Sequence, residues 1–121
     1  MARNTGKESP FAQLLPHILD QIPVAVTVID LEGTIRYFNA YAPQLLDRKP
    51  EYIGRDVRAC HMKPESNARI DEMIAAFKGG RRDRFTWEVT RNRRRLVLAL
   101  SPLEVEGRLV GCIHSVIVKP E

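Results

Sequence analysis

The sequence predicts an α+β fold in which helices pack against one face of an antiparallel sheet. Segments typical of strands lie near both ends of the chain, marked by β-branched residues near the N-terminus and by alternating side chains near the C-terminus. Between them the apolar residues recur at intervals of three and four, which is typical of helices. The chain has 121 residues, a length that fits one domain with its own core. These observations indicate one sheet built from both ends of the chain, with the helices between its strands.

The chain starts with a polar stretch that is followed by an amphipathic helix. Residues 1–8 are polar, and we expect them to be disordered. Ser9 and Pro10 are typical of a helix start and predict a helix over residues 9–22. Pro16 interrupts this segment, so we expect a kinked or shortened helix. The apolar residues that share one face of it are Phe11, Leu14, Leu15, Ile18, Leu19 and Ile22. This stripe needs a partner, which is either the domain's own sheet or a second subunit.

Five strands are predicted in two groups. Residues 24–29 and 34–38 flank a turn sequence, Asp-Leu-Glu-Gly, and predict an antiparallel hairpin. In residues 85–90 and 96–101 two sets of side chains alternate, as in strands, and a turn at Glu106 and Gly107 leads into a third strand over residues 109–118. These three strands predict an antiparallel meander.

The segment between the two groups of strands is predicted to be helical. Residues 40–46 form one short helix, and residues 47–64 leave room for one or two helical turns. A longer helix starts near residue 64 and ends at Gly79 and Gly80. The apolar residues on one face of it are Ile70, Met73, Ile74 and Phe77.

Composition excludes several classes of protein. Cys60 and Cys112 are the only cysteines, so we do not expect a disulfide framework. No apolar run approaches the roughly 20 residues of a membrane span, and residues 1–20 lack the apolar core of a signal peptide. These features predict a soluble cytoplasmic protein. The sequence has neither a nucleophile elbow nor a glycine-rich phosphate loop, so we do not expect an enzyme.

The basic character of the chain is concentrated in one stretch. The net charge is +4, with an isoelectric point near 9.4. Residues 78–95 contain eight basic and two acidic residues, and the remainder is slightly acidic. Residues 91–95, Arg-Asn-Arg-Arg-Arg, are interpreted as a solvated turn between two strands, with Asn92 as the turn residue. Weak contact with phosphate or with an acidic partner is the alternative, and we do not expect specific binding of nucleic acid.

Three stretches of the chain carry a resemblance to a known family. Residues 22–39, IPVAVTVIDLEGTIRYFN, resemble the opening hairpin of PAS domains, whose final asparagine fixes the chain as it leaves the strand. Residues 53–61, IGRDVRACH, and residues 77–83, FKGGRRD, resemble a bacterial PAS subgroup with a GRDV…CH signature before its long helix. The resemblance covers residues 18–118 and places the PAS domain at residues 23–118. It implies a five-stranded sheet whose concave face and flanking helices enclose a pocket, and a module that is often dimeric.

The resemblance makes His61 the first candidate for a binding residue, because some heme-binding PAS sensors resemble this sequence at a nearby histidine. A neutral imidazole there can ligate heme iron. The alternative role for His61 is to cap the following helix. A second axial ligand is not evident, and the candidates for it are Met62, Cys112 and His114. The spacing of the Cys and His residues does not match a structural zinc site, which we therefore do not expect.

Apolar residues complete the candidate pocket. Trp87 can stack on a planar ligand, although packing in the core or at a dimer contact is the simpler interpretation. Ile74 and Phe77 are expected first as core and second as pocket wall. Cys112 and His114 share one face of the last strand, and the sequence leaves open whether that face lines the pocket. Cys112 is expected to be a small buried hydrophobe.

Together these features predict a PAS sensory and signal-transduction module. We expect it to bind a small molecule or heme and to relay occupancy through a homodimer contact, made by the N-terminal helix and the sheet, or through an effector protein. The alternatives are an interaction or dimerisation module without a ligand, and a weak nucleic-acid-binding regulator.

Overall fold

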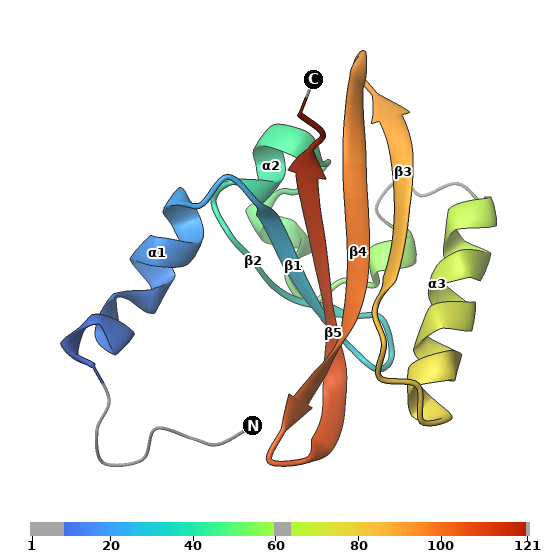
Figure 1. Cartoon of the computed structure of the whole chain (residues 1–121). Coiled ribbons are helices and arrows are strands. Elements are labelled where there is room, and N and C mark those ends of the chain that lie inside the picture. Colours follow the sequence, from blue (N-terminus) through green and yellow to red (C-terminus); the bar gives the residue numbers. More distant parts are fainter. Residues whose placement is uncertain (1–8, 60–63, 121) are drawn as a thin grey trace.

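A computed structural model describes residues 9–59 and 64–120 of the chain (Figure 1). The element order agrees with the order predicted from the sequence. The elements are η1 (Pro10–Leu14), α1 (Leu15–Gln21), β1 (Ala25–Asp30), β2 (Ile35–Phe38), α2 (Ala42–Leu45), η2 (Pro50–Tyr52), η3 (Val57–Ala59), α3 (Pro64–Lys78), β3 (Phe85–Arg91), β4 (Arg94–Val105) and β5 (Arg108–Val118).

The five strands form one antiparallel sheet in the order β2-β1-β5-β4-β3. The predicted hairpin and the predicted meander are both confirmed, and β5 joins them by pairing with β1 on one side and β4 on the other. The β3–β4 turn consists of Asn92 and Arg93, whose positive φ angles of 52° and 64° match the right-handed twist of the flanking strands. Glu106 and Gly107 make a similar turn between β4 and β5.

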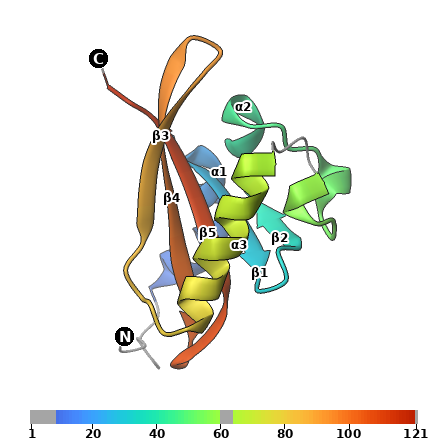
Figure 2. The same cartoon turned by 90° about the vertical axis from the view of Figure 1, so that its right-hand side faces the viewer.

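The helices lie on two sides of the sheet. In Figure 2, α3 crosses in front of the strands, whereas α1 lies behind them. The segment from α2 to η3 lies beside α3 and covers the β1 and β2 end of the sheet. None of the helices in residues 9–59 and 64–120 is long and apolar enough to cross a membrane.

The apolar core is divided into two clusters. One cluster lies between α3 and the sheet and includes residues of both, namely Ile29, Ile35, Tyr52, Val57, Ile70, Met73, Ile74, Phe77, Leu100 and Cys112. The other cluster lies between α2 and the sheet and consists of Ala25, Ala42, Leu45, Leu96, Leu98 and Val116. Both clusters use the inward-facing positions of the strands, which alternate along each strand with positions on the outer face.

The N-terminal segment is helical, but it divides into two elements close to Pro16. Ser9 caps η1 by accepting a hydrogen bond from the Phe11 amide at 3.1 Å, and α1 begins at Leu15, with Pro16 in its first turn. Proline is tolerated in the first turn of an α-helix, where its missing amide proton is not needed. Pro16 therefore lies where a new α-helix starts rather than inside one long helix.

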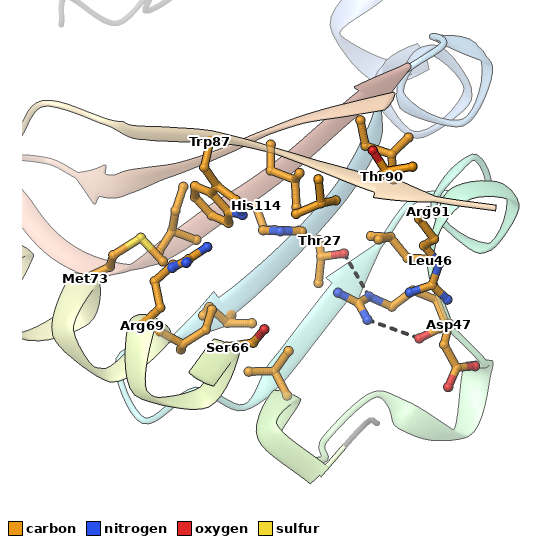
Figure 3. A pocket seen from close by; sticks show the side chains of 18 residues that line it. Thr27, Leu46, Asp47, Ser66, Arg69, Met73, Trp87, Thr90, Arg91 and His114 are labelled. Carbon is orange, nitrogen blue, oxygen red and sulfur yellow. Dashed lines mark hydrogen bonds between the residues drawn. The ribbon is translucent and has the colours of Figure 1, made fainter. Parts of the chain in front are cut away.

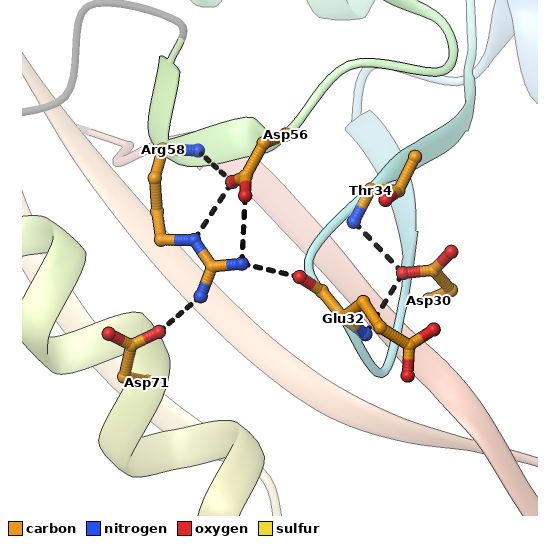
Figure 4. A network of polar contacts seen from close by, with 6 residues as sticks. All are labelled: Asp30, Glu32, Thr34, Asp56, Arg58 and Asp71. Carbon is orange, nitrogen blue, oxygen red and sulfur yellow. Dashed lines mark hydrogen bonds and ion pairs between the residues drawn. The ribbon is translucent and has the colours of Figure 1, made fainter.

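Arg58 links α3 to the strands below it (Figure 4). Its Nε lies 2.8 Å from Oδ1 of Asp56, and its two terminal nitrogens also donate to Asp71 of α3 and to the carbonyl oxygen of Glu32 in the β1–β2 turn. The hydrogen bond and charge of Arg58 lower the pKa of Asp56, and the same contacts raise the pKa of Arg58. This clamp fixes the position of α3 over the sheet.

Candidate functional site

A cavity of about 840 Å³ lies between α3, the inner face of the sheet and the segment that follows α2 (Figure 3). The lining residues are Thr27, Ile29, Leu46, Asp47, Arg48, Val57, Ser66, Arg69, Ile70, Met73, Trp87, Val89, Thr90, Arg91, Leu96, Leu98, Leu100 and His114. Most of this lining is apolar, and its polar side chains come from the sheet, from α3 and from the chain after α2.

Two polar residues lie side by side on the sheet, which forms the floor of the cavity. Thr27 of β1 is paired in register with His114 of β5. The neighbouring inward-facing pairs on the same two strands are Ile29 with Cys112 and Ala25 with Val116, one in each core cluster. The Thr27–His114 pair therefore interrupts the apolar inner face at the position where the two clusters separate.

Arg48 brings a positive charge to this pair. Its Nε donates a hydrogen bond to Oγ1 of Thr27 at 3.1 Å, and its Nη1 donates to the carbonyl oxygen of Asp47 at 3.1 Å. The side chain is half-buried. Because the guanidinium keeps its proton at all ordinary pH values, it is a permanent charge at the cavity floor.

The imidazole of His114 is held in its neutral form. Burial is the main cause, the positive charge of Arg48 is the second, and together they lower the pKa of His114 to about 3. Its Nδ1 is buried and has no hydrogen-bond partner among the described residues. The ring lies beside that of Trp87, with the ring centroids 6.1 Å apart and the two planes tilted by 46°. This histidine can ligate a metal or make a hydrogen bond to a ligand without first losing a proton.

Two further arginines lie at the more exposed parts of the lining. Arg69 of α3 stands over the ring of Trp87, with its guanidinium carbon 5.9 Å from the ring centroid. Arg91 lies at the other end of the cavity, near Leu46 and Asp47 (Figure 3). Three arginines and one carboxylate therefore line the cavity, which gives it a positive balance of charge.

The site residues predicted from the sequence fall into three groups. Trp87 and His114 both line the cavity, and their ring centroids lie 6.1 Å apart. Ile74, Phe77 and Cys112 are fully or almost fully buried in the cluster under α3 and are not among the lining residues. Burial raises the pKa of the Cys112 thiol to about 11, so it stays protonated. His61 and Met62 lie outside the described residues.

Sequence reasoning missed the polar floor of the cavity. Thr27, Arg48 and Arg69 were not singled out, although Thr27 is a polar residue in a strand whose other inward residues, Ala25 and Ile29, are apolar. That interruption of the alternation was the available signal. Arg48 carried no such signal, because it contacts Thr27 only through the tertiary fold.

Residues 91–95 form the predicted hairpin tip, with Asn92 and Arg93 in the turn and the other three residues at the ends of β3 and β4. Part of its charge is compensated within the sheet, because Glu88 contacts Nη2 of Arg95 at 2.6 Å and Nζ of Lys119 at 3.3 Å. Within residues 9–59 and 64–120, no group of three or more potential metal ligands gathers.

Comparison with known proteins identifies the family. A family model described as "PAS domain" matches residues 15–117. No protein of curated function matches the sequence. Among solved structures, a C-terminal domain from Streptococcus mutans superposes with a TM-score of 0.77 at 19% identity, covering 98% of this chain and 90% of its own. The PAS domain of a Colwellia psychrerythraea protein gives a TM-score of 0.70 at 20% identity, covering 90% and 97%.

A third similar structure was solved with a ligand. It is the PAS domain of the Cronobacter turicensis quorum-sensing receptor RpfR in complex with BDSF, with a TM-score of 0.62 at 18% identity, covering 83% of this chain and 97% of its own. At these identities the structures establish the shared fold, while the family model covers most of the sequence. The chain belongs to the PAS domain family of sensory and signal-transduction modules.

Proposed function

We propose that this PAS domain senses a small organic molecule that binds in the cavity between α3 and the sheet. The observation that carries the proposal is the cavity itself, whose volume of about 840 Å³ lies within the range of small-molecule sites. Its lining also has the composition of such sites, which is an apolar wall with a few polar groups that fix orientation.

The chain after α2 gives the cavity a connection to the N-terminal helix. Leu46, Asp47 and Arg48 line the cavity and follow α2 directly. Asn39 lies just before α2, and its side-chain amide donates to the carbonyl oxygen of Leu19 in α1 at 2.6 Å. If a ligand contacts Arg48 in only one arrangement of the chain from Asn39 to Arg48, it stabilises that arrangement. Because Asn39 holds the end of α1, binding would then change which position of α1 is most populated. Occupancy would then reach a second subunit or an effector protein through α1.

Heme is a second candidate ligand, and His114 is the described residue that favours it. An unpartnered, neutral imidazole in a largely apolar cavity suits an axial ligand. A heme bound there would supply an iron centre able to bind diatomic gases. His61 remains the candidate that the family resemblance implies.

The first test is to block the cavity with a bulky side chain. Ser66→Phe places a ring inside it from α3, whereas Ala75→Phe adds the same ring to an exposed position of that helix. We expect wild type and Ala75→Phe to be stabilised by compounds from a small-molecule library in thermal unfolding scans, and Ser66→Phe to lose these shifts. Shifts that survive Ser66→Phe, or no shift for any compound in wild type, would contradict ligand sensing through this cavity.

Hemin is tested separately by absorption spectroscopy. If heme is the ligand, wild type develops a Soret band on titration with hemin, and either His114→Ala or His61→Ala changes its position or removes it. A spectrum that equals that of free hemin with wild type rules out the heme version. The module without a ligand remains the alternative if neither hemin nor any library compound binds.

A further inference from the structure

The polar residues on the floor of the cavity indicate which class of molecule can bind there. We propose that the ligand is an amphiphilic anion whose carboxylate-type group binds at Thr27, Arg48 and His114 and whose apolar body lies along the sheet. This inference rests on the proposed ligand-sensing function and adds the class of molecule that is sensed.

The charge of the cavity favours an anion. Arg48 donates a hydrogen bond to Thr27 at 3.1 Å, and Thr27 is paired in register with His114, so the guanidinium places a positive charge at the floor of the cavity. Arg69 and Arg91 add positive charge toward the more exposed parts of the lining, against the single carboxylate of Asp47. A cationic ligand would be repelled by this arrangement, whereas an anion gains from it in a partly water-excluded site.

The hydrogen-bonding groups favour a planar acceptor such as a carboxylate. The arginine guanidinium is a planar fork of N–H donors that matches carboxylate geometry. Nδ1 of His114 is buried without a partner among the described residues, which is unfavourable until a ligand group supplies one. In the tautomer with a proton on Nδ1, the imidazole donates to the same acceptor group as Arg48.

The rest of the lining requires an apolar body. The strands supply Ile29, Leu96, Leu98 and Leu100 to the cavity, and α3 supplies Ile70 and Met73. A small inorganic anion would leave this surface and most of the 840 Å³ without contact. Trp87 lies beside His114, so either a chain or a planar ring system fits the space next to the polar floor.

The single tryptophan of the chain is a direct reporter for this site. Trp87 lines the cavity, and its indole N–H gives one signal in a ¹⁵N-labelled sample. We would titrate the protein with two matched sets of probes that differ only in the head group. One set is decanoate, decan-1-ol and decylamine, and the other is naphthalene-2-carboxylate and naphthalene-2-methanol.

The carboxylate of each set is expected to bind at least about tenfold more tightly than its alcohol, and decylamine more weakly than decan-1-ol. Arg48→Met should reduce the preference for the carboxylate to about twofold or less, while Arg48→Lys retains part of it. Arg93→Met removes a charge at the β3–β4 turn, outside the cavity, and should leave the preference unchanged.

The wild-type titrations alone can overturn the inference, even if an Arg48 variant does not fold. Equal affinity for decanoate and decan-1-ol, or tighter binding of decylamine, would reject an anionic ligand while leaving a ligand-binding cavity in place. Absence of binding by every probe would reject the amphiphilic anion, and the library screen with Ser66→Phe and Ala75→Phe then decides the proposed function separately.

Discussion

Asn39 is a fully buried amide that makes four hydrogen bonds to three segments of the chain. Its Oδ1 accepts from the backbone amides of Val26, at 3.0 Å, and Ala42, at 3.2 Å. Its Nδ2 donates to the carbonyl oxygens of Leu19, at 2.6 Å, and Val24, at 2.9 Å. One side chain therefore links the end of α1, the start of β1 and the start of α2. Buried backbone amides and carbonyl oxygens need hydrogen-bond partners, and the Asn39 side chain supplies one to each of these groups.

We predict that Asn39→Ala lowers the free energy of unfolding by about 3 kcal/mol, because buried backbone groups lose their partners. Urea denaturation measures the change. Asn92→Gly is the matched control, since Asn92 lies in an exposed turn with a φ of 52° that glycine adopts freely, and its stability should stay within about 0.5 kcal/mol of wild type. A small effect of Asn39→Ala would show that water replaces the amide.

The low pKa of His114 predicts that the protein loses stability in mild acid. The pKa of this side chain in the folded state, about 3, is below the ordinary value of 6.5. The unfolded chain therefore binds a proton that the folded chain does not, and stability falls as the pH drops from about 6.5 toward 3. Between pH 7 and pH 5 the loss from this group is about 2 kcal/mol.

Urea denaturation at pH 7 and pH 5 tests this expectation. His114→Gln should remove most of the difference between the two pH values, whereas His17→Gln, at an exposed position of α1, should leave it as in wild type. The same pH dependence in wild type and His114→Gln would contradict a neutral, buried imidazole.

At the scale of elements, the clamp at Arg58 explains how α3 keeps its place over the cavity. The guanidinium joins η3, α3 and the β1–β2 turn, and the side chain is only 26% exposed. Gly33 of the same turn has a φ of 88°, and a Cβ atom there would lie 2.5 Å from Nη2 of Arg58. The turn therefore favours glycine for its backbone angle, and a Cβ atom there would displace the Arg58 guanidinium from its present position.

We predict that Arg58→Ala loosens α3 and lowers the free energy of unfolding by about 1–2 kcal/mol, since the arginine serves several partners at once. Hydrogen exchange should become faster in the amides of α3 around Asp71 than in β4 and β5. Arg36→Ala is the control, because Arg36 is 62% exposed and its Nε and Nη2 both contact one carboxylate oxygen, Oδ2 of Asp30, near the same turn rather than joining separate elements. Equal effects of the two variants would show that the clamp does not hold the helix.

At the scale of the whole molecule, α1 lies on the side of the sheet away from α3 (Figures 1 and 2). The apolar stripe of this N-terminal segment is exposed: Phe11 of η1 is 67% exposed, and Leu15 and Ile18 of α1 are 53% and 43% exposed. Leu19 is partly buried, and its carbonyl oxygen is held by Asn39. The end of α1 is thus attached to the domain while its apolar stripe remains open to a second copy of the chain.

We predict that the domain is a homodimer and that Leu15→Glu makes it monomeric, because a charge would replace a leucine at the contact. Sedimentation equilibrium measures the change. His17→Glu adds the same charge at another exposed position of α1 and should leave the dimer intact. A wild type that is monomeric at all concentrations would exclude homodimerisation and leave an effector protein as the partner for this stripe.

Most of the architecture could be predicted from local sequence patterns. The local signals are the β-branched run in β1, the alternation in β3 and β4, the helical spacing in α3 and the turn residues. Each of them acts over a few neighbouring residues, so it can be recognised from the sequence alone. The division near Pro16 was foreseen only as a kink or a shortening of one helix, because the type of helix on each side of a proline depends on its surroundings.

The sequence by itself determined the fold family, the N-terminal hairpin and the C-terminal meander, whereas the pairing of β5 with β1 and the contact of Asn39 with Leu19 came only from the tertiary structure. The sequence also determined that Cys112 and His114 share one face of the last strand, because side chains alternate along a strand. Only the tertiary structure decided that this face is the inner one and that His114 reaches the cavity whereas Cys112 lies in the core. It also decided that Arg48 meets Thr27, 21 positions earlier in the chain. The physical reason is that alternation fixes which residues lie together on a face, whereas the packing of distant segments fixes what that face meets.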